Sequence, residues 1–199
     1  MPCGDMETEK NVLRRKYAAL RKALSAEERA GKDALIRERI AALPLFRQAE
    51  NIAAYACFGA EVDLSGLFHG KRLFLPRFEA RSGVYEMVAV ENLKRDLLPG
   101  KYGIQEPLPS LPAVDREFLA SQVLFLVPAV ACDRRGCRLG RGGGFYDRLL
   151  AGVKTPVIAA VYSCQISETA LPGAEHDTPV GVIVTEREVI DTKTGDRSF

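Results

Sequence analysis

The first part of the chain repeats apolar positions with the period of an α-helix. Between residues 7 and 24 they recur every three or four positions, which places them in one narrow stripe: Leu13, Tyr17, Leu20 and Leu24. A second helix is predicted from Ser25, because Ser25 and Glu28 have the spacing of a capping box, and Pro44 ends it. Its buried face is expected to carry Ala30, Leu35, Ile36, Ile40 and Leu43. Two helices are therefore expected over about residues 7–43.

Beyond residue 50 the pattern changes to short apolar runs separated by turn residues. The runs predict strands at 52–58, 72–78, 84–90, 123–131, 157–162 and 180–185. Several are apolar throughout, which is typical of parallel strands covered on both faces, and helical segments fit between some of them at 64–70 and 144–151. The expected fold class is α/β: a three-layer α/β/α arrangement with a mostly parallel central sheet, preceded by the two N-terminal helices.

Two further segments lie outside this alternation. The Pro-rich stretch 97–112 predicts a long ordered loop, and loops of that length are usually functional. The last residues, 192–199, are expected to fray. A length of 199 residues suits one domain, so residues 1–199 are expected to form a single α/β domain.

The composition argues against several classes of protein. A net charge of +2 is too small to indicate a nucleic-acid or membrane partner, and no segment is long and apolar enough for a transmembrane helix. The five cysteines include no CxxC pair and predict reduced thiols, while the two histidines argue against a histidine-rich zinc site. Acidic residues at the beginning of the chain argue against a signal or transit peptide. We expect a cytoplasmic monomer that binds neither nucleic acid nor membrane.

The stretch CRLGRGGGFYDRLL (137–150) carries four glycines in five positions between a predicted strand and a predicted helix. Such a loop presents backbone N–H groups to an anion, because glycine allows positive φ and a helix N-terminus favours negative charge. Arg138 and Arg141 add guanidinium groups suited to phosphate oxygens. The pattern is neither a Walker A loop nor the dinucleotide fingerprint. An anion site is nevertheless favoured over a glycine-rich hairpin without a ligand.

Charged residues beside this loop and on the first helix have two interpretations each. Asp147 lies in the first turn of the predicted helix, where it interacts with the dipole or, beside a bound nucleotide, reaches Mg²⁺. Lys10, Arg14 and Arg21 lie within about 40° of one another, on a strip that borders the apolar stripe. A strip at this border can face a cleft, although a solvated basic face is favoured when the helix is considered alone.

These residues resemble those of the 5-formyltetrahydrofolate cyclo-ligase family, also called 5,10-methenyltetrahydrofolate synthetase. The most specific element is RLGRGGGFYDRLL, and the likeness covers nearly the whole chain. It includes Lys10-x-x-x-Arg14, SAEER at 25–29, Glu61 after the first predicted strand, LPRF followed by EMV, the YGIQEP segment and HDTPVGVIVTE.

The resemblance implies an ATP-dependent enzyme of one-carbon metabolism that binds MgATP and 5-formyltetrahydrofolate. Such a ligase transfers the γ-phosphate to the formyl oxygen and closes N10 onto the activated carbon. This forms a C–N bond and releases ADP, phosphate and 5,10-methenyltetrahydrofolate. A formamide-like carbonyl is a poor electrophile whose oxygen leaves badly, so phosphorylation supplies a good leaving group. Catalysis is then mostly positioning and charge stabilisation.

The resemblance also implies roles for individual residues. Lys10 and Arg14 would contact the ATP phosphates, and one segment would wrap the triphosphate: Arg138, Leu139, Gly140, Arg141, Gly142, Gly143, Gly144, Phe145 and Tyr146. Within it, residues 141–145 would border the formyl group, with Arg141 and Tyr146 as catalytic residues. Glu61 would hold the pterin, and Asp147 would hold Mg²⁺. Phe58, Tyr85 and Met87 are candidates for pterin contact, but core packing is favoured for each.

One position departs from the family pattern. Where the family has a second acidic Mg²⁺ ligand, in a pattern like HDxPxD, this chain has Gly181. Mg²⁺ can be held by one carboxylate with nucleotide phosphates and water, so Asp147 alone can suffice, with Asp177 as a second candidate. We expect weaker Mg²⁺ binding than in relatives with both acids, and we expect His176 to shape this segment. The alternative is another phosphate- or nucleotide-binding enzyme on a similar α/β scaffold, with activity altered by Gly181.

Overall fold

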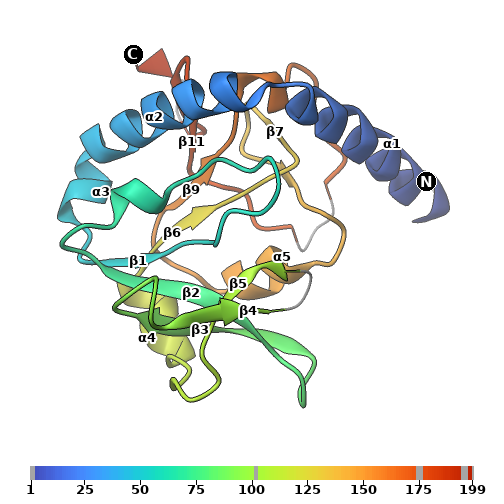
Figure 1. The fold of residues 1–199 in the computed structure, drawn as a ribbon. Coiled ribbons are helices and arrows are strands. Elements are labelled where there is room, and N and C mark those ends of the chain that lie inside the picture. The colour runs from blue at the N-terminus through green and yellow to red at the C-terminus, as the bar shows by residue number, and fades with distance from the viewer. Residues whose placement is uncertain (1–2, 101–102, 174–176, 194–196, 199) are drawn as a thin grey trace.

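A mostly parallel sheet forms the centre of the molecule. The structure, a computed structural model, describes residues 3–100, 103–173, 177–193 and 197–198. Its main sheet has eight strands in the order β13-β12-β11-β9-β6-β1-β2-β3 (Figure 1). The pairs β1–β2, β1–β6, β6–β9 and β9–β11 are parallel, and the outer pairs β2–β3, β11–β12 and β12–β13 are antiparallel. These strands are β1 (Asn51–Ala53), β2 (Arg72–Glu79), β3 (Val84–Val90), β6 (Leu124–Val127), β9 (Val157–Ala160), β11 (Val182–Val184), β12 (Val189–Asp191) and β13 (Arg197–Ser198).

Helices cover both faces of this sheet. On one face, Ile36, Ile40 and Phe46 of α2 and α3 pack into a core with the strands. On the other face, Leu119 of α4 and Leu150 of α5 pack into a second core. The three-layer α/β/α arrangement with two N-terminal helices is therefore confirmed. The helices are α1 (Cys3–Lys22), α2 (Ala26–Ala42), α3 (Pro44–Gln48), α4 (Arg116–Gln122) and α5 (Phe145–Leu150), with 3₁₀ turns η1 (Ser65–Leu67) and η3 (Ser163–Gln165).

Two small sheets flank the main one and correct two expectations. The predicted strand 123–131 is broken: β6 ends before Pro128, and the chain resumes as β7 in a separate sheet of order β10-β7-β8. The Pro-rich stretch 97–112 is not a plain loop, because it contains the antiparallel pair β4–β5. The strands are β4 (Leu97–Pro99), β5 (Gln105–Pro107), β7 (Ala131–Asp133), β8 (Arg138–Leu139) and β10 (Ile166–Ser167).

Local signals on the predicted helices are mostly confirmed. Ser25 and Glu28 form the expected capping box at the start of α2. Pro44 ends α2 as expected, and it also begins α3, since a proline is well suited to the first helical position. The helix expected at 64–70 is only the 3₁₀ turn η1. Within the segment 192–199 that we expect to fray, β13 pairs with β12.

The packing of α1 and α2 differs from the sequence expectation at four positions, of which Ala30 is exposed although it was predicted on the buried face. Leu20 and Leu35 are each 43% exposed, whereas Arg21 is only 8% exposed. In Figure 1, α1 continues past α2 towards the right of the molecule and leaves the main sheet. There Tyr17 packs with Leu139 of the small sheet rather than with the main core. Because α1 contacts the rest of the protein along a narrow strip, a leucine on it can be exposed to solvent while the neighbouring arginine is buried.

Candidate active site

One cavity of about 680 Å³ collects the residues singled out in the sequence. Its walls come from α1, the segments that follow β1 and β6, strands β2, β3 and β8, the loop between β4 and β5, strand β5, the glycine-rich loop and α5. The carboxyl ends of parallel strands open at the same edge of a sheet, which explains why the segments after β1 and β6 meet here. All residues assigned by the resemblance line this cavity: Lys10, Arg14, Glu61, Asp147 and all nine residues 138–146.

The glycine-rich loop has its backbone N–H groups available. Gly142 and Gly144 adopt φ values of 97° and 61°, which side-chain-bearing residues rarely adopt. Within the described part of the chain, no group accepts a hydrogen bond from a backbone N–H of residues 140–144. The loop carbonyls are held instead: Arg14 Nε donates to Gly140 O and Arg148 Nη2 donates to Gly143 O, each at 3.0 Å. The loop is thus braced through its acceptors while its donors remain free for an anion.

The helix behind the loop contributes less than the sequence suggests. α5 has only six residues, so its dipole is small, and the loop follows the β7–β8 hairpin rather than a strand of the main sheet. Arg138 and Leu139 are buried strand residues of β8 rather than loop residues. Positive charge at this site therefore comes mainly from arginine and lysine side chains.

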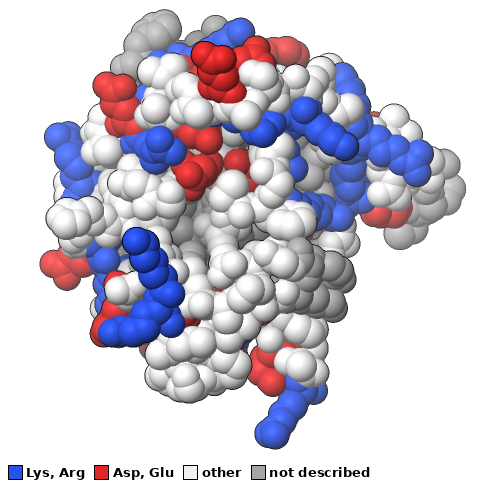
Figure 2. All heavy atoms as spheres, viewed as in Figure 1, with Lys and Arg blue, Asp and Glu red and all other residues white. Residues whose placement is uncertain are grey.

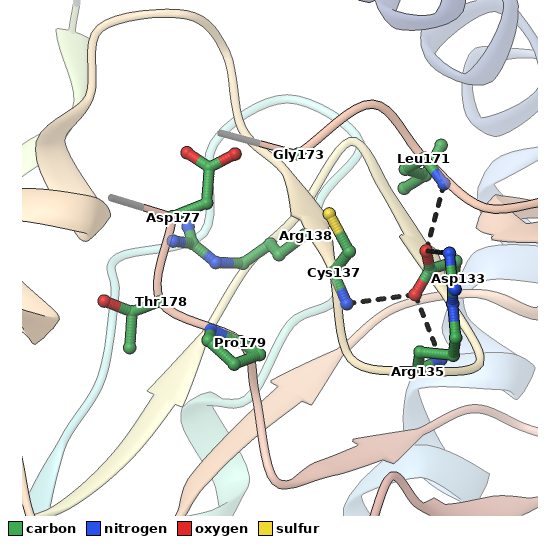
Figure 3. A pocket seen from close by; sticks show the side chains of 9 residues that line it. All are labelled: Asp133, Arg135, Cys137, Arg138, Leu171, Gly173, Asp177, Thr178 and Pro179. Atoms are coloured by element: carbon green, nitrogen blue, oxygen red, sulfur yellow. Dashed lines mark hydrogen bonds and ion pairs between the residues drawn. The ribbon is translucent and has the colours of Figure 1, made fainter. Parts of the chain in front are cut away.

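The hairpin that carries the loop is fixed by Asp133. Its carboxylate accepts hydrogen bonds from the backbone N–H groups of Arg135, Cys137 and Leu171 (Figure 3). A side chain at Gly136 would collide with the carbonyl of Val180, which explains a glycine in this turn. The sequence prediction of a turn at 133–136 is confirmed.

Each predicted cation of the site is paired with an acid or a carbonyl. Lys10 Nζ lies 3.2 Å from Asp177 Oδ2, and Arg138 Nη2 lies 2.6 Å from Asp147 Oδ1. The Arg138 side chain is 2% exposed, and its Nε has no partner among the described residues. Figure 3 shows Arg138 beside Asp177, where the cavity borders a second, smaller pocket. Figure 2 shows lysine and arginine side chains gathered along α1 and below it.

Arg141 and Glu61 join the loop to the segment after β1. Arg141 Nη2 donates to Glu61 Oε1 at 2.7 Å, and its guanidinium lies 4.8 Å from the centre of the Phe58 ring. Lys10, Arg14, Arg138 and Arg141 form the cationic part of the cavity, and the Arg141–Glu61 pair links this part to a residue that the resemblance assigns to the pterin. Phe58 itself lines the cavity, so the core role favoured for it is wrong.

The aromatic rings of Tyr85, Phe145 and Tyr146 form another wall of the cavity. Tyr85 contacts Phe78 at 5.2 Å and Phe145 at 4.5 Å between ring centres, and Phe145 contacts Tyr146 at 4.6 Å. Tyr85 lines the cavity, against expectation, whereas Met87 is 2% exposed and belongs to the core as expected. Burial raises the pKa of the Tyr146 hydroxyl well above its usual range, and the charge of Glu61 adds to the rise. Tyr146 therefore remains a protonated donor at neutral pH.

Three other predicted positions lie away from the cavity or outside the description. Arg21 does not line it; burial lowers the pKa of Arg21, and the nearby Glu61 opposes that effect. Gly181 does not line it either, and a Cβ there would meet only Val157 O at 3.8 Å. His176 lies outside the described residues. Among those that the structure describes, no three Asp, Glu, His or Cys side chains gather as a metal site.

Sequence reasoning missed Glu106 and Arg148 as cavity residues. Arg148 lies one helical turn after the glycines. The sequence does not distinguish an arginine on the helix surface from one that hydrogen-bonds back to the loop, as Arg148 does. Glu106 belongs to the YGIQEP segment, which resembles the family but implies no role for this acid. Both line the cavity.

The sheet, the cavity at its strand ends and the arginine-braced glycine loop are the features of an α/β protein with an anion-binding site. The sequence model of the 5-formyltetrahydrofolate cyclo-ligase family matches residues 6–186, so the chain belongs to this family.

Individual relatives agree with this membership. The 5-formyltetrahydrofolate cyclo-ligase of Escherichia coli K12 is 30% identical over 177 residues, covering 85% of this chain and 96% of the relative. The mouse protein of the same name is 28% identical, covering 94% and 98%. A solved structure of Aquifex aeolicus 5,10-methenyltetrahydrofolate synthetase matches with a TM-score of 0.80 at 35% identity, covering 96% of this chain and 95% of that one.

Proposed function

We propose that this protein uses ATP to convert 5-formyltetrahydrofolate into 5,10-methenyltetrahydrofolate, with release of ADP and phosphate. The observation that carries the proposal is the cavity itself. It combines a glycine loop with free N–H groups, several cations and an aromatic wall within about 680 Å³. The names of the relatives in bacteria and mouse support the same activity.

The reaction needs two ligands in one cavity. The formyl oxygen attacks the γ-phosphorus of ATP, ADP leaves, and the formyl carbon becomes an electrophile with phosphate as its leaving group. The N10 lone pair then attacks that carbon, phosphate departs, and the N10 proton is lost. Since the groups are tethered in one folate, the protein mainly has to align them and stabilise the transferring phosphoryl charge.

The cationic part of the cavity is proposed to bind the triphosphate. Lys10, Arg14 and Arg138 supply positive charge, and the N–H groups of residues 140–144 supply hydrogen bonds that follow the phosphate oxygens. Leu139 contributes only backbone, because its side chain is buried in a small core with Tyr17. Phosphate binding would exchange existing protein ion pairs for pairs with the nucleotide.

Arg141 and Tyr146 are proposed as the catalytic residues. Arg141 belongs to the glycine loop and reaches Glu61. From this position its guanidinium can stabilise the negative charge that develops on the transferring phosphoryl group. Tyr146 keeps its proton and can therefore donate to the formyl or phosphoryl oxygen. Glu61, freed from Arg141, would bind the N–H groups of the reduced pterin.

The chemistry of the donors fits one Mg²⁺ ion bound together with ATP. Asp147 has a side chain 26% exposed to the cavity, and Mg²⁺ commonly binds through one or two carboxylates plus phosphates. Asp147 would hold the ion and Asp177 is the second candidate. When bound, Mg²⁺ supplies charge neutralisation on the phosphate oxygens. Asp147 would then exchange its partner Arg138, leaving that guanidinium for a phosphate.

The direct test is incubation with 5-formyltetrahydrofolate, ATP and Mg²⁺. We expect the methenyl chromophore and ADP to appear together in equal amounts. Turnover of ATP without the chromophore would contradict the proposal and favour another nucleotide-dependent enzyme. Omission of either ligand provides the control.

We also propose that the protein acts as a cytoplasmic monomer on small molecules. The four described cysteines, Cys57, Cys132, Cys137 and Cys164, are free thiols, which suits a reducing compartment. No helix within the described ranges is long and apolar enough to cross a bilayer. Light scattering on the purified protein measures the oligomeric state, and a dimer mass would contradict the monomer.

A further inference from the structure

Glu106 is a buried acid of the cavity to which neither the sequence motifs nor the proposed reaction gives a role. It lies on β5, lines the cavity and is 8% exposed. Within the described residues, one hydrogen bond reaches its side chain, from the backbone N–H of Phe78 to Oε2 at 3.2 Å. A carboxylate can accept about four hydrogen bonds, and a buried one is costly unless they are made. Glu106 therefore has unused acceptor capacity inside the cavity.

The protein holds this carboxylate in a fixed orientation. β5 is paired with β4, with Glu106 opposite Leu98 in the register. Gly100, in the same hairpin, lies so close beneath the Glu106 side chain that a Cβ there would collide with it. Backbone pairing, the Phe78 N–H and the contact with Gly100 thus constrain the carboxylate before any ligand arrives.

The position of Glu106 relative to the aromatic rings indicates what it faces. Phe78, whose N–H binds Glu106, begins the row of rings that continues through Tyr85 and Phe145 to Tyr146. The Tyr146 ring in turn lies 5.5 Å from the Arg138 guanidinium. Glu106, Tyr85 and Phe145 all line the cavity, so the carboxylate and these two rings face the same space. A flat heterocycle bound against these rings can present one edge to the carboxylate.

We propose that Glu106 determines specificity for the pterin by accepting hydrogen bonds from N3–H and the 2-amino group of its pyrimidine ring. These two donors are adjacent on one edge of the heterocycle, and a carboxylate offers two oxygens at matching separation. Glu61 then binds nearer the reacting atoms, because it is paired with Arg141. This inference rests on the proposed folate substrate.

The test compares two ligands on two proteins by calorimetric titration in the presence of Mg²⁺ and a non-hydrolysable ATP analogue. The variant is Glu106→Gln, which keeps an oxygen for the Phe78 N–H and replaces the other acceptor by a donor. The ligands are 5-formyltetrahydrofolate and its 2-desamino analogue. We expect the variant to bind 5-formyltetrahydrofolate about tenfold to a hundredfold more weakly, since each hydrogen bond to a charged group contributes roughly that order.

The analogue separates recognition from a merely structural role. Wild-type protein is expected to bind the 2-desamino analogue about tenfold more weakly than the natural ligand, and Glu106→Gln should discriminate little between the two. Equal losses for both ligands in the variant would show that Glu106 only supports the wall, and would overturn the inference. Equal affinity of wild-type protein for both ligands would overturn it without any variant.

A matched control lies on the same strand. Gln105 is the exposed neighbour of Glu106, and Gln105→Glu makes the reverse isosteric change outside the cavity. It should leave folate affinity unchanged, and a loss equal to that of Glu106→Gln would contradict a specific role. If wild-type protein forms the methenyl product while Glu106→Gln binds normally, this inference alone fails. If wild-type protein forms no methenyl product, the proposed function fails as well.

Discussion

The cationic and aromatic parts of the cavity are prepared for ligands in opposite ways. In the cationic part, Lys10 and Arg138 are paired with Asp177 and Asp147, so the proposed triphosphate would have to replace existing ion pairs. In the aromatic part, the rings are in mutual contact and Glu106 keeps unused acceptor capacity. On the proposed assignment, the nucleotide would replace the protein partners of several charged side chains, whereas the pterin would meet an aromatic surface that is already formed and would displace only the Arg141–Glu61 pair. The two parts meet at the pair Arg141–Glu61.

The largest expected effect is at this junction. Arg141→Ala removes the guanidinium that both parts share, so we expect kcat to fall by about a hundredfold to a thousandfold while the fold stays intact. Steady-state rates of methenyl formation measure the loss, and circular dichroism checks the fold. Arg81→Ala, at an exposed arginine in the turn between β2 and β3, is the control. Near-normal turnover of Arg141→Ala would remove this residue from the mechanism.

A change confined to the cationic part should act on one ligand. Lys10→Met removes a phosphate contact and the partner of Asp177, and we expect the dissociation constant of ATP to rise by about tenfold to thirtyfold. The dissociation constant of 5-formyltetrahydrofolate alone should stay within about twofold. Lys22→Met, at an exposed lysine of the same helix, should change neither constant. A larger effect on folate than on ATP would reverse the assignment of the two parts.

The aromatic part allows the converse experiment. Tyr85→Leu keeps an apolar side chain but removes the ring between Phe78 and Phe145, so the KM for 5-formyltetrahydrofolate should rise by about threefold to tenfold. The KM for ATP should hardly change. The conservative variant Tyr85→Phe should have a KM for 5-formyltetrahydrofolate close to that of the wild-type protein. If Tyr85→Leu raises both KM values equally, the two parts are not separate.

The smallest effect is expected at the metal. Gly181→Asp restores the acid of the family pattern, and the position has room for a side chain. We expect half-maximal activity at an Mg²⁺ concentration about threefold lower. A second carboxylate adds negative charge to a site in which one carboxylate can already hold the ion. Gly181→Asn has nearly the same volume without the charge and should not show the shift. An unchanged Mg²⁺ titration for Gly181→Asp would mean that this position does not reach the metal.

Long periodic patterns in the sequence predicted most of the fold. Helices α1 and α2 and the strands of the parallel sheet have sufficient apolar repetition to be found from local pattern alone. The equally short β1 and β11 lie within longer apolar runs, whereas the pairs β4–β5 and β7–β8 were missed because their strands have two or three residues, most of them with polar residues or proline among them. Strands this short outside an apolar run have no usable period, and contacts with other segments stabilise them.

The candidate site was predictable where a local motif carries it. The glycine-rich loop and Lys10-x-x-x-Arg14 are each a short continuous stretch of sequence, and both line the cavity. Glu106 and Arg148 could not be found in this way, because one depends on a hairpin packed against β2 and β3 and the other on how the loop folds back over α5. Tyr85 and Phe58 were assigned to the core because aromatic residues on strands usually pack there.

By itself, the sequence determined the freedom of the glycine loop, the two initial helices and the supply of positive charge, since these depend on residues close together along the chain. Only the tertiary structure decided which acid each cation meets, as Lys10 and Asp177 are 167 positions apart. It also decided that Leu20 is exposed while Arg21 is buried. Burial and pairing depend on which distant segments pack together, and that is a property of the whole folded chain.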